Sequence, residues 1–302
     1  MDKKALVKYL ASMLLFGLNG IVADHIPLNS YEIVLLRTCI GSLLLVTLFL
    51  LGKGKFHLRA YKRDALFIAL SGVAMGASWM CLYEGYQQIG VSLSSLLYYC
   101  GPVIVMMLSP LLFREKLTAA KLIGFAVVLV GLFLVNGAVV QNGLNAWGLL
   151  CGFLSAVTYF LMVTFNKQST RITGMENAVI QLITAFITVG IFVGCKQGLL
   201  IRMPLEAWGW ALLLGLVNTG FGGYLYFSSL ATLPAQTVAV CGYLELLSAV
   251  VFAALLLNER MTVPQLIGAA CILLGAMLGE LWRPKKRITK IQKSSIAPTR
   301  KS

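Results

Sequence analysis

Long apolar runs recur along the whole chain and are separated by short polar segments. A helix needs about 20 predominantly apolar residues to cross a bilayer, and each run is close to that length. A helix also satisfies its own backbone hydrogen bonds in lipid, whereas an open strand does not. The sequence therefore predicts an all-α polytopic membrane protein with ten transmembrane helices, over residues 5–23, 30–51, 64–86, 92–113, 118–136, 144–166, 174–195, 206–229, 235–257 and 262–282.

The basic residues between these runs fall almost entirely on one side of the predicted membrane. If the N-terminus is inside, the inner segments carry 21 Lys and Arg residues, and the outer segments carry only Lys196, Arg202 and Arg260. The remaining basic residue, Arg37, lies within a run. Cytoplasmic loops are enriched in Lys and Arg. The asymmetry therefore favours ten spans and predicts that both the N- and C-termini are cytoplasmic.

Composition and charge narrow the class of protein. Of the 302 residues, 59% are hydrophobic and 12% are charged, compared with roughly half and a quarter in a soluble domain. This excludes an ordinary soluble enzyme, a disordered chain and a disulfide scaffold. The net charge of +14 includes a tail, residues 283–302, that has eight Lys and Arg and no acidic residue. We expect this tail to lie on the anionic cytoplasmic leaflet rather than on nucleic acid.

The sequence offers no constellation for catalysis or metal binding. Its seven cysteines are scattered without a C-x-x-C pair, and its two histidines, His25 and His57, lie in predicted loops. Neither pattern is typical of a disulfide framework or a metal site. A Gly-Lys-Gly-Lys stretch at 52–55 lacks the spacing and the Ser or Thr of a phosphate-binding loop. We therefore expect no enzyme activity, no metal and no cofactor.

An internal repeat appears when the sequence is shifted by 144 residues. Glu115–Gly131 then aligns with Glu259–Gly275, and both contain Glu-x-x-Thr-x-x-x-Leu-Ile-Gly. The chain is therefore predicted to consist of two five-helix repeats, 1–137 and 138–282, followed by the basic tail 283–302. Five is an odd number, so the two repeats would enter the membrane in opposite directions. Transporters built from such inverted repeats bind their substrate near the midplane, between the halves.

Ten helices in two repeats that carry this motif resemble the drug/metabolite transporter superfamily, EamA-like family. Arg37 in the second helix and Gly101-Pro102 in the fourth add to the resemblance. Departures are Glu245-Leu246, where the family often has Glu-Pro, and Gln181 at the position that matches Arg37. The resemblance implies export, or less often uptake, of amino acids or similar metabolites across the bacterial inner membrane. It also implies that helices one, three, four, six, eight and nine line the path.

Two charged residues within the predicted spans are the leading candidates for the site. Polar groups inside a membrane are costly and are often functional. Glu245 lies about ten residues into its helix, and therefore about 15 Å deep, where it could take a proton or meet a substrate ammonium. Arg37 could clamp a carboxylate, and Glu245 and Glu84 are its candidate partners. The alternative is that Glu245 and Arg37 only hold helices together.

Aromatic and amide side chains accompany these charges on the same helices. Aromatic faces attract amines, although such residues also serve as core or interfacial belt. Since adjacent helical residues point apart, only one of Tyr98 and Tyr99 is expected to line a cavity. Asn19, Asn218 and Thr219 could orient a substrate or join helices. The aromatic candidates are Trp79, Tyr83, Tyr98, Tyr99, Tyr159, Tyr224 and Tyr243.

Glycine and proline mark candidate hinges. Gly101 and Pro102 are predicted near the middle of the fourth helix, where proline would kink it and expose carbonyls to a cavity or aid packing. Gly222 and Gly223 soften the eighth helix. Gly-x-x-x-Gly pairs begin at Gly72, Gly148, Gly190 and Gly275 and permit close helix contact, within the chain or in a homodimer. Glu115 and Glu259, at helix junctions, are interpreted as structural.

Together these features predict a secondary transporter that exports a small amino-acid-like or other polar metabolite by alternating access, with protons as a candidate coupling ion. The expected partners are this solute and membrane lipid. One alternative is an uptake carrier for an amine or nucleoside-like solute. Another is a non-transporting membrane sensor, which an empty, greasy space between the halves would favour.

Overall fold

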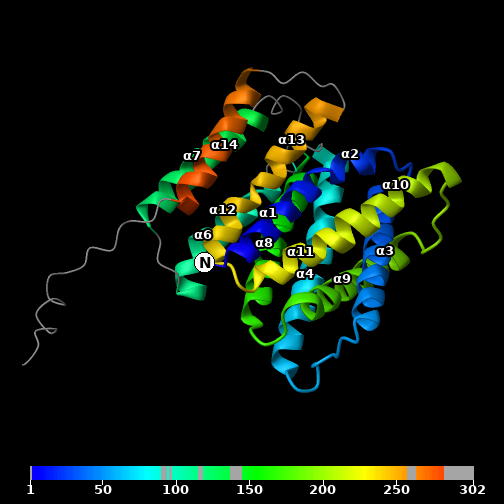
Figure 1. Ribbon diagram of the computed structural model, residues 1–302. Coiled ribbons are helices and arrows are strands. Elements are labelled where there is room, and N and C mark those ends of the chain that lie inside the picture. Colours follow the sequence, from blue (N-terminus) through cyan, green and yellow to red (C-terminus); the bar gives the residue numbers. More distant parts are fainter. Residues whose placement is uncertain are drawn as a thin grey trace, which may run out of the picture.

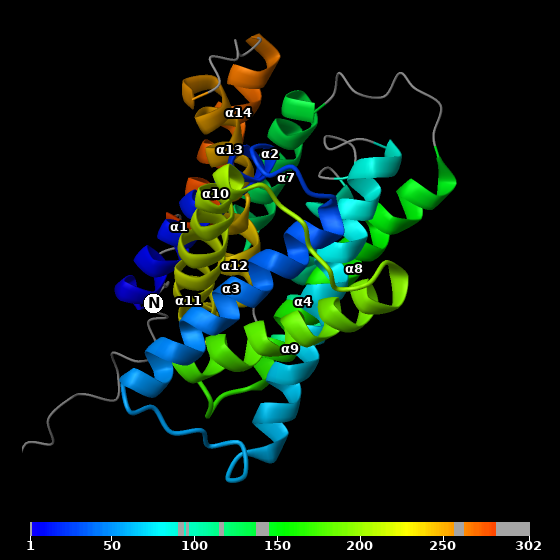
Figure 2. The same ribbon diagram turned by 90° about the vertical axis from the view of Figure 1, so that its right-hand side faces the viewer.

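The computed structural model describes residues 2–89, 94, 97–114, 118–136, 145–256 and 263–281. Within these ranges the regular structure is entirely helical (Figures 1 and 2). Glu115, Glu259 and the basic tail, on which predictions were made above, lie outside the described residues. In the N-terminal half the helices are α1 (Lys3–Gly17), α2 (Asn19–Asp24), α3 (Ser30–Leu51), α4 (Lys62–Ile89), α6 (Cys100–Phe113) and α7 (Ala119–Asn136).

The C-terminal half contains three uninterrupted long helices and two stretches in which the helix is irregular or broken. A π-helical segment, η3, lies between two short α-helices, so the predicted helix 206–229 is continuous but irregular. The predicted helix 235–257 is interrupted at Tyr243. The elements are α8 (Ala146–Gln168), α9 (Gly174–Lys196), η2 (Leu205–Ala207), α10 (Trp208–Leu212), η3 (Leu213–Phe221), α11 (Gly222–Leu230), α12 (Ala235–Gly242), α13 (Leu244–Leu256) and α14 (Val263–Leu281).

Five helical segments of the described chain are long and apolar enough to cross a membrane, namely Lys3–Ala23, α3, α4, α8 and α9. They agree closely with the predicted runs; α3 has the predicted limits and α9 extends the prediction by one residue. The ends of α7 and α14 also lie within one residue of the predicted limits, whereas the predicted helices 92–113, 206–229 and 235–257 are interrupted or irregular. The helical membrane class is therefore confirmed, while the number of ten spans and the inverted repeat stay predictions.

Helices from the two halves pack against each other rather than forming separate bundles. α4 packs on α8 and α9, α3 packs on α9 and η3, and α1 packs on α11 and α13. Figures 1 and 2 show α7 and α14 side by side, away from α3 and α9. Small residues permit the close contacts. A Cβ atom at Gly76 would lie 3.1 Å from the Ala185 carbonyl of α9, and one at Gly148 would lie 2.5 Å from Ile89 of α4. Gly76 and Gly148 therefore permit close contacts between helices of the same chain.

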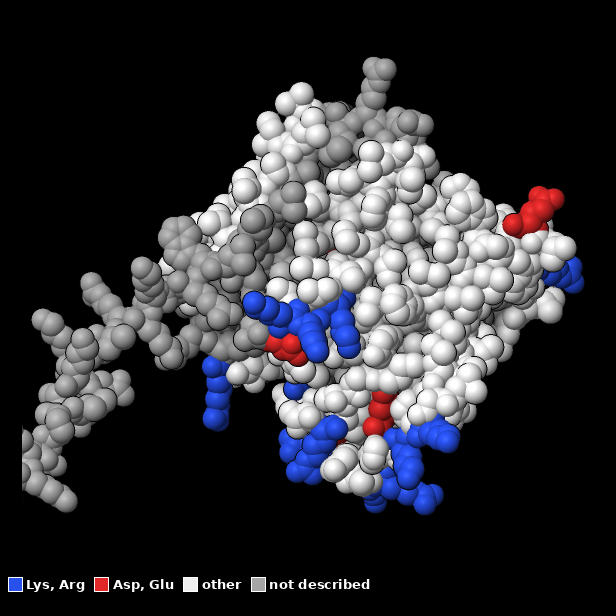
Figure 3. Space-filling model, viewed as in Figure 1, with Lys and Arg blue, Asp and Glu red and all other residues white. Residues whose placement is uncertain are grey.

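Most of the described Lys and Arg residues gather at one end of the molecule, at the bottom of Figure 3. The loop 53–61 joins α3 to α4, whose first turn adds Lys62 and Arg63, and Arg171 lies in the turn between α8 and α9. These segments meet because Asp64 accepts hydrogen bonds from the backbone N–H groups of Thr170 (2.8 Å) and Arg171 (2.7 Å). Glu176 likewise accepts from the His57 backbone N–H at 2.6 Å. The charge asymmetry of the sequence thus corresponds to one end of the fold.

Candidate functional site

A cavity lies between the two halves of the chain, with about 730 Å³ of space that holds no protein atoms and is partly open to solvent. Its wall is made by α1, α2, α3, α4, the segment leading into α6 and the first turn of α6 on one side, and by α8, α9, η3, α11, α12 and α13 on the other. The lining residues are Met13, Phe16, Asn19, Arg37, Met75, Ser78, Trp79, Tyr98, Tyr99, Pro102, Tyr159, Met162, Leu182, Thr219, Gly223, Tyr226, Phe227, Gly242 and Glu245.

Two opposite charges share this cavity. Glu245 is in the first turn of α13, just after the break at Tyr243, and a helix N-terminus favours a negative charge. Arg37, on α3, lines the same cavity. The Glu245 side chain forms no hydrogen bond with any other residue that the structure describes. Its carboxylate is therefore open to a ligand in the cavity.

Arg37 is 3% exposed and is held on two sides. Its Nε donates a hydrogen bond to Thr219 Oγ1 at 2.9 Å, and its guanidinium lies 4.5 Å from the centre of the Trp79 ring. Among the described residues, ion pairs within 4.0 Å join His57 to Glu176 and Lys196 to Glu84. The hydrogen-bond partner of Arg37 is therefore Thr219, rather than either of the carboxylates considered from the sequence.

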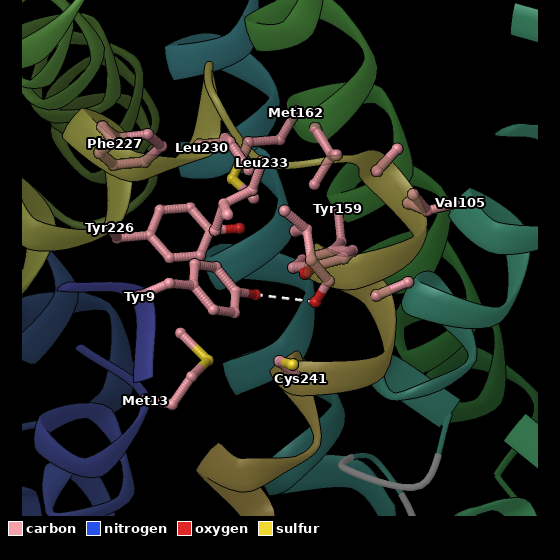
Figure 4. Packing of buried hydrophobic residues seen from close by; sticks show 14 of the residues in the cluster. Tyr9, Met13, Val105, Tyr159, Met162, Tyr226, Phe227, Leu230, Leu233 and Cys241 are labelled. Carbon is pink, nitrogen blue, oxygen red and sulfur yellow. Dashed lines mark hydrogen bonds between the residues drawn. The ribbon is translucent and has the colours of Figure 1, made fainter. Parts of the chain in front are cut away.

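Tyrosines form the aromatic part of the wall. The Tyr98 ring packs edge-on against Tyr99 and Tyr159, with centroids 5.4 Å apart in both pairs. Both Tyr98 and Tyr99 line the cavity, so the expectation that only one would do so is wrong. Tyr99 keeps a right-handed helical backbone conformation, and neighbouring residues of a helix are only about 100° apart, so both side chains can face one cavity. In Figure 4, Tyr226 and Tyr159 lie near Tyr9, whose hydroxyl donates to the Val238 carbonyl at 2.9 Å.

The candidate hinges lie where the regular helical pattern changes. α6 starts at Cys100, so Gly101 and Pro102 occupy its first turn and not the centre of a helix, as the sequence suggested. A proline there disrupts no hydrogen bond, since first-turn N–H groups have no helical partner. Gly222 and Gly223 begin α11, directly after η3. Pro102 and Gly223 line the cavity, whereas Gly222 packs against Phe16 of α1.

Several predicted site residues lie outside the cavity. Glu84 is near the end of α4 away from the basic loops, 3.5 Å from Lys196 and hydrogen-bonded by Trp147 and Gln88. Tyr83 packs beside a small cluster around α3 and α9. Tyr224 lies under the Lys8 ammonium.

The remaining two support the wall from behind. Tyr243 is fully buried, and its hydroxyl donates to the Tyr99 carbonyl at 2.8 Å. Asn218 donates to Asn19 Oδ1 at 3.1 Å, so it holds a lining residue without lining the cavity itself.

Sequence reasoning missed several lining residues. The apolar ones, such as Met13, Met75 and Leu182, carry no signal that separates them from core residues. Tyr226 did carry a signal, since it is an aromatic residue on the same helix as the predicted Tyr224. It lies two positions after Tyr224 and so faces another side of the helix. A choice between the two required knowledge of which face of α11 meets α1.

The cavity can accommodate a small solute that has both an apolar part and separate charges. Arg37 suits a carboxylate, Glu245 suits an ammonium group, and aromatic and methionine side chains surround both. Among the described residues there is no group of three or more His, Cys, Asp or Glu side chains that could hold a metal ion.

Comparisons with known proteins give consistent results. The model of the EamA-like transporter family matches residues 3–137 and 146–279. The chain is 24% identical over 284 residues to the uncharacterized transporter YxxF of Bacillus subtilis, covering 91% of this chain and 88% of that protein. An uncharacterized transporter of Archaeoglobus fulgidus is 24% identical over 282 residues, covering 90% and 94%.

A known crystal structure has a similar fold. It superposes with a TM-score of 0.79 at 14% identity, covering 93% of this chain and 99% of the other. At this identity the likeness concerns the fold alone. The matching names describe transporters rather than enzymes.

Proposed function

The chain belongs to the EamA-like transporter family, and we propose that this membrane transporter is a secondary carrier for a small zwitterionic, amino-acid-like metabolite. Alternating access would move the solute, and export across the inner membrane is the proposed direction. The observation that carries the proposal is the pair Arg37 and Glu245 in one aromatic cavity between the halves. A zwitterion carries an anionic and a cationic group and can pair with both residues at once, which a solute without charged groups cannot do.

The arrangement of the cavity supports an inverted repeat. Three pairs of its lining residues are separated by 144 positions, the shift found in the sequence. They are Met75 with Thr219, Trp79 with Gly223, and Tyr98 with Gly242. The helix breaks at Tyr99 and Tyr243 have the same spacing. Transporters with inverted repeats commonly place interrupted helices at corresponding positions around the substrate.

Glu245 is the proposed coupling residue. Its carboxylate has no hydrogen-bond partner among the described residues, so it can bind a proton or a substrate ammonium but not both at once. Competition of this kind links the movement of a solute to a proton gradient. This coupling requires that the Glu245 carboxylate cannot bind the solute and a proton at the same time.

The test is solute exchange in liposomes. Purified protein is reconstituted and offered labelled amino acids and amines, with and without an imposed pH gradient. We expect gradient-dependent accumulation of at least one zwitterion, and its loss in Glu245→Gln. Glu206→Gln is the matched control, because Glu206 is exposed and lies in η2, outside the cavity. Unchanged gradient dependence in Glu245→Gln would refute the coupling role.

The same panel separates the alternatives. An amine-only carrier would accumulate amines and ignore zwitterions, which the aromatic wall and Glu245 would allow but the adjacent Arg37 disfavours. A folded protein that moves nothing would favour the sensor. Partnership with a second copy of the chain is left as a prediction, to be examined by the mass of the detergent-solubilised protein.

A further inference from the structure

Thr219 occupies a special position in the π-helical segment η3. Its hydroxyl lies 2.8 Å from the Leu214 carbonyl oxygen and 2.9 Å from Arg37 Nε. A hydroxyl has one hydrogen and two lone pairs. The carbonyl can only accept, so the single hydrogen points to Leu214 and a lone pair points to Arg37. The direction of both hydrogen bonds is therefore fixed.

Thr219 packs closely against α3, and its hydroxyl is held by the backbone of η3. The Leu214 carbonyl lies five residues earlier, which is the π-helical spacing. A Cβ atom at Gly41 of α3 would lie only 3.0 Å from Thr219 Cγ2, and one at Gly220 would lie 2.8 Å from Leu44 Cδ2. The two glycines thus let α3 approach η3 closely. The distance between Arg37 and Thr219 is set by this contact.

Trp79 fixes the other side of the guanidinium. The ring covers one face at 4.5 Å, and Thr219 takes Nε. The remaining edge of the Arg37 guanidinium carries the two terminal nitrogens. It forms no hydrogen bond with any residue that the structure describes. Two parallel N–H groups on such an edge match the two oxygens of a carboxylate.

We infer that Thr219 is a positioning residue, which aims the terminal nitrogens of Arg37 into the cavity and so selects solutes that carry a carboxylate or a similar planar oxyanion. The inference rests on the proposed function, in which Arg37 receives the anionic end of the solute. It adds that selection depends on a neutral side chain in η3. If Thr219 could not accept from Nε, Arg37 would rotate about its own side chain and lose this aim.

The test measures equilibrium binding of labelled L-leucine and L-leucinamide, which differ in a carboxylate and a neutral amide, to protein in nanodiscs. Thr219→Val keeps the shape of the side chain and removes the acceptor. We expect it to raise the dissociation constant for L-leucine about tenfold, equivalent to the loss of one hydrogen bond between the displaced guanidinium and the ligand carboxylate, and that for L-leucinamide less than about twofold. Thr219→Ser retains the hydroxyl and should restore binding.

Thr38→Val is the matched control. Thr38 is a buried threonine next to Arg37 in sequence, but its hydroxyl donates only to carbonyls of its own helix, at Val34 and Leu35. In Thr38→Val, the ratio of the dissociation constants for L-leucine and L-leucinamide should equal that of the unmodified protein. Equal weakening of both ligands by Thr219→Val, no weakening, or no preference for L-leucine in the unmodified protein would each overturn the inference. Carboxylate-dependent binding without transport would instead refute only the proposed function.

Discussion

At the scale of single residues, two glycines beside the cavity differ in what surrounds them. A Cβ atom at Gly101 would lie 2.7 Å from Tyr159 Cδ1 and 3.1 Å from the Ala156 carbonyl, whereas one at Gly223 would meet nothing within 4 Å. Overpacking of this kind costs about 1–3 kcal/mol. We expect Gly101→Ala to lower the midpoint of thermal unfolding in detergent by about 5 °C.

Gly223→Ala is the matched control and should leave the midpoint unchanged, because its new methyl group enters open space. Equal midpoints for the two variants would mean that α6 and α8 can move apart without cost. The close contact at Gly101 would then not constrain the wall.

Residue chemistry was easier to predict than residue orientation. Glu245, Arg37 and Trp79 stand out in the sequence because charge and large aromatic rings are unusual in a span, and all three line the cavity. Glu84 stands out equally but faces Lys196 instead. Tyr98 and Tyr99 both line the cavity although they are adjacent in sequence. Such outcomes depend on tertiary contacts, about which a local pattern carries no information.

At the scale of elements, hydrophobic length predicted the uninterrupted helices well and the broken ones poorly. α3 and α9 are regular and have ends within one residue of the prediction. The interruptions at Tyr99, at η3 and at Tyr243 all have glycine or proline nearby, but intact helices such as α4 also contain glycines, so these residues alone did not locate the breaks. They occur where polar groups of both halves face each other, since the freed backbone can be satisfied beside a cavity.

Asp64 clamps the turn between α8 and α9, and this contact leads to an element-scale prediction. Its carboxylate accepts from two backbone N–H groups of the turn, at Thr170 and Arg171. Hydrogen bonds to a charged group contribute about 1.5–3 kcal/mol each. Asp64→Ala should therefore loosen the turn and raise the rate of trypsin cleavage after Arg171 several-fold, as followed by mass spectrometry.

Asp64→Asn should give an intermediate rate, because an amide oxygen can still accept from the turn but carries no charge. Cleavage after Lys53 and Lys55, in the loop between α3 and α4, serves as the internal reference, since the hydrogen bonds of the Asp64 carboxylate in the described chain go to residues 169–171. An unchanged ratio of the two cleavage rates would show that the turn is held by other contacts.

At the scale of the whole molecule, the fold separates its charged ends. The loop 53–61, the first turn of α4 and the turn at Arg171 lie at one end, whereas Lys196 and Glu84 pair at the other end of α9 and α4. Because cytoplasmic loops are rich in Lys and Arg, the basic end is expected to face the cytoplasm. The sidedness matters for function, since it decides which end of the cavity would load a solute for export.

A native cysteine provides the test of this orientation. Cys195 is exposed and adjacent to Lys196, at the end of α9 opposite the basic loops. A membrane-impermeant maleimide should therefore label it in intact cells, and Cys195→Ser should remove this label. Lys55→Cys in the Cys195→Ser background should react only after the membrane is permeabilised, because Lys55 lies in the basic loop. The reverse pattern would place the basic end outside, and the proposed direction of loading would then have to be inverted as well.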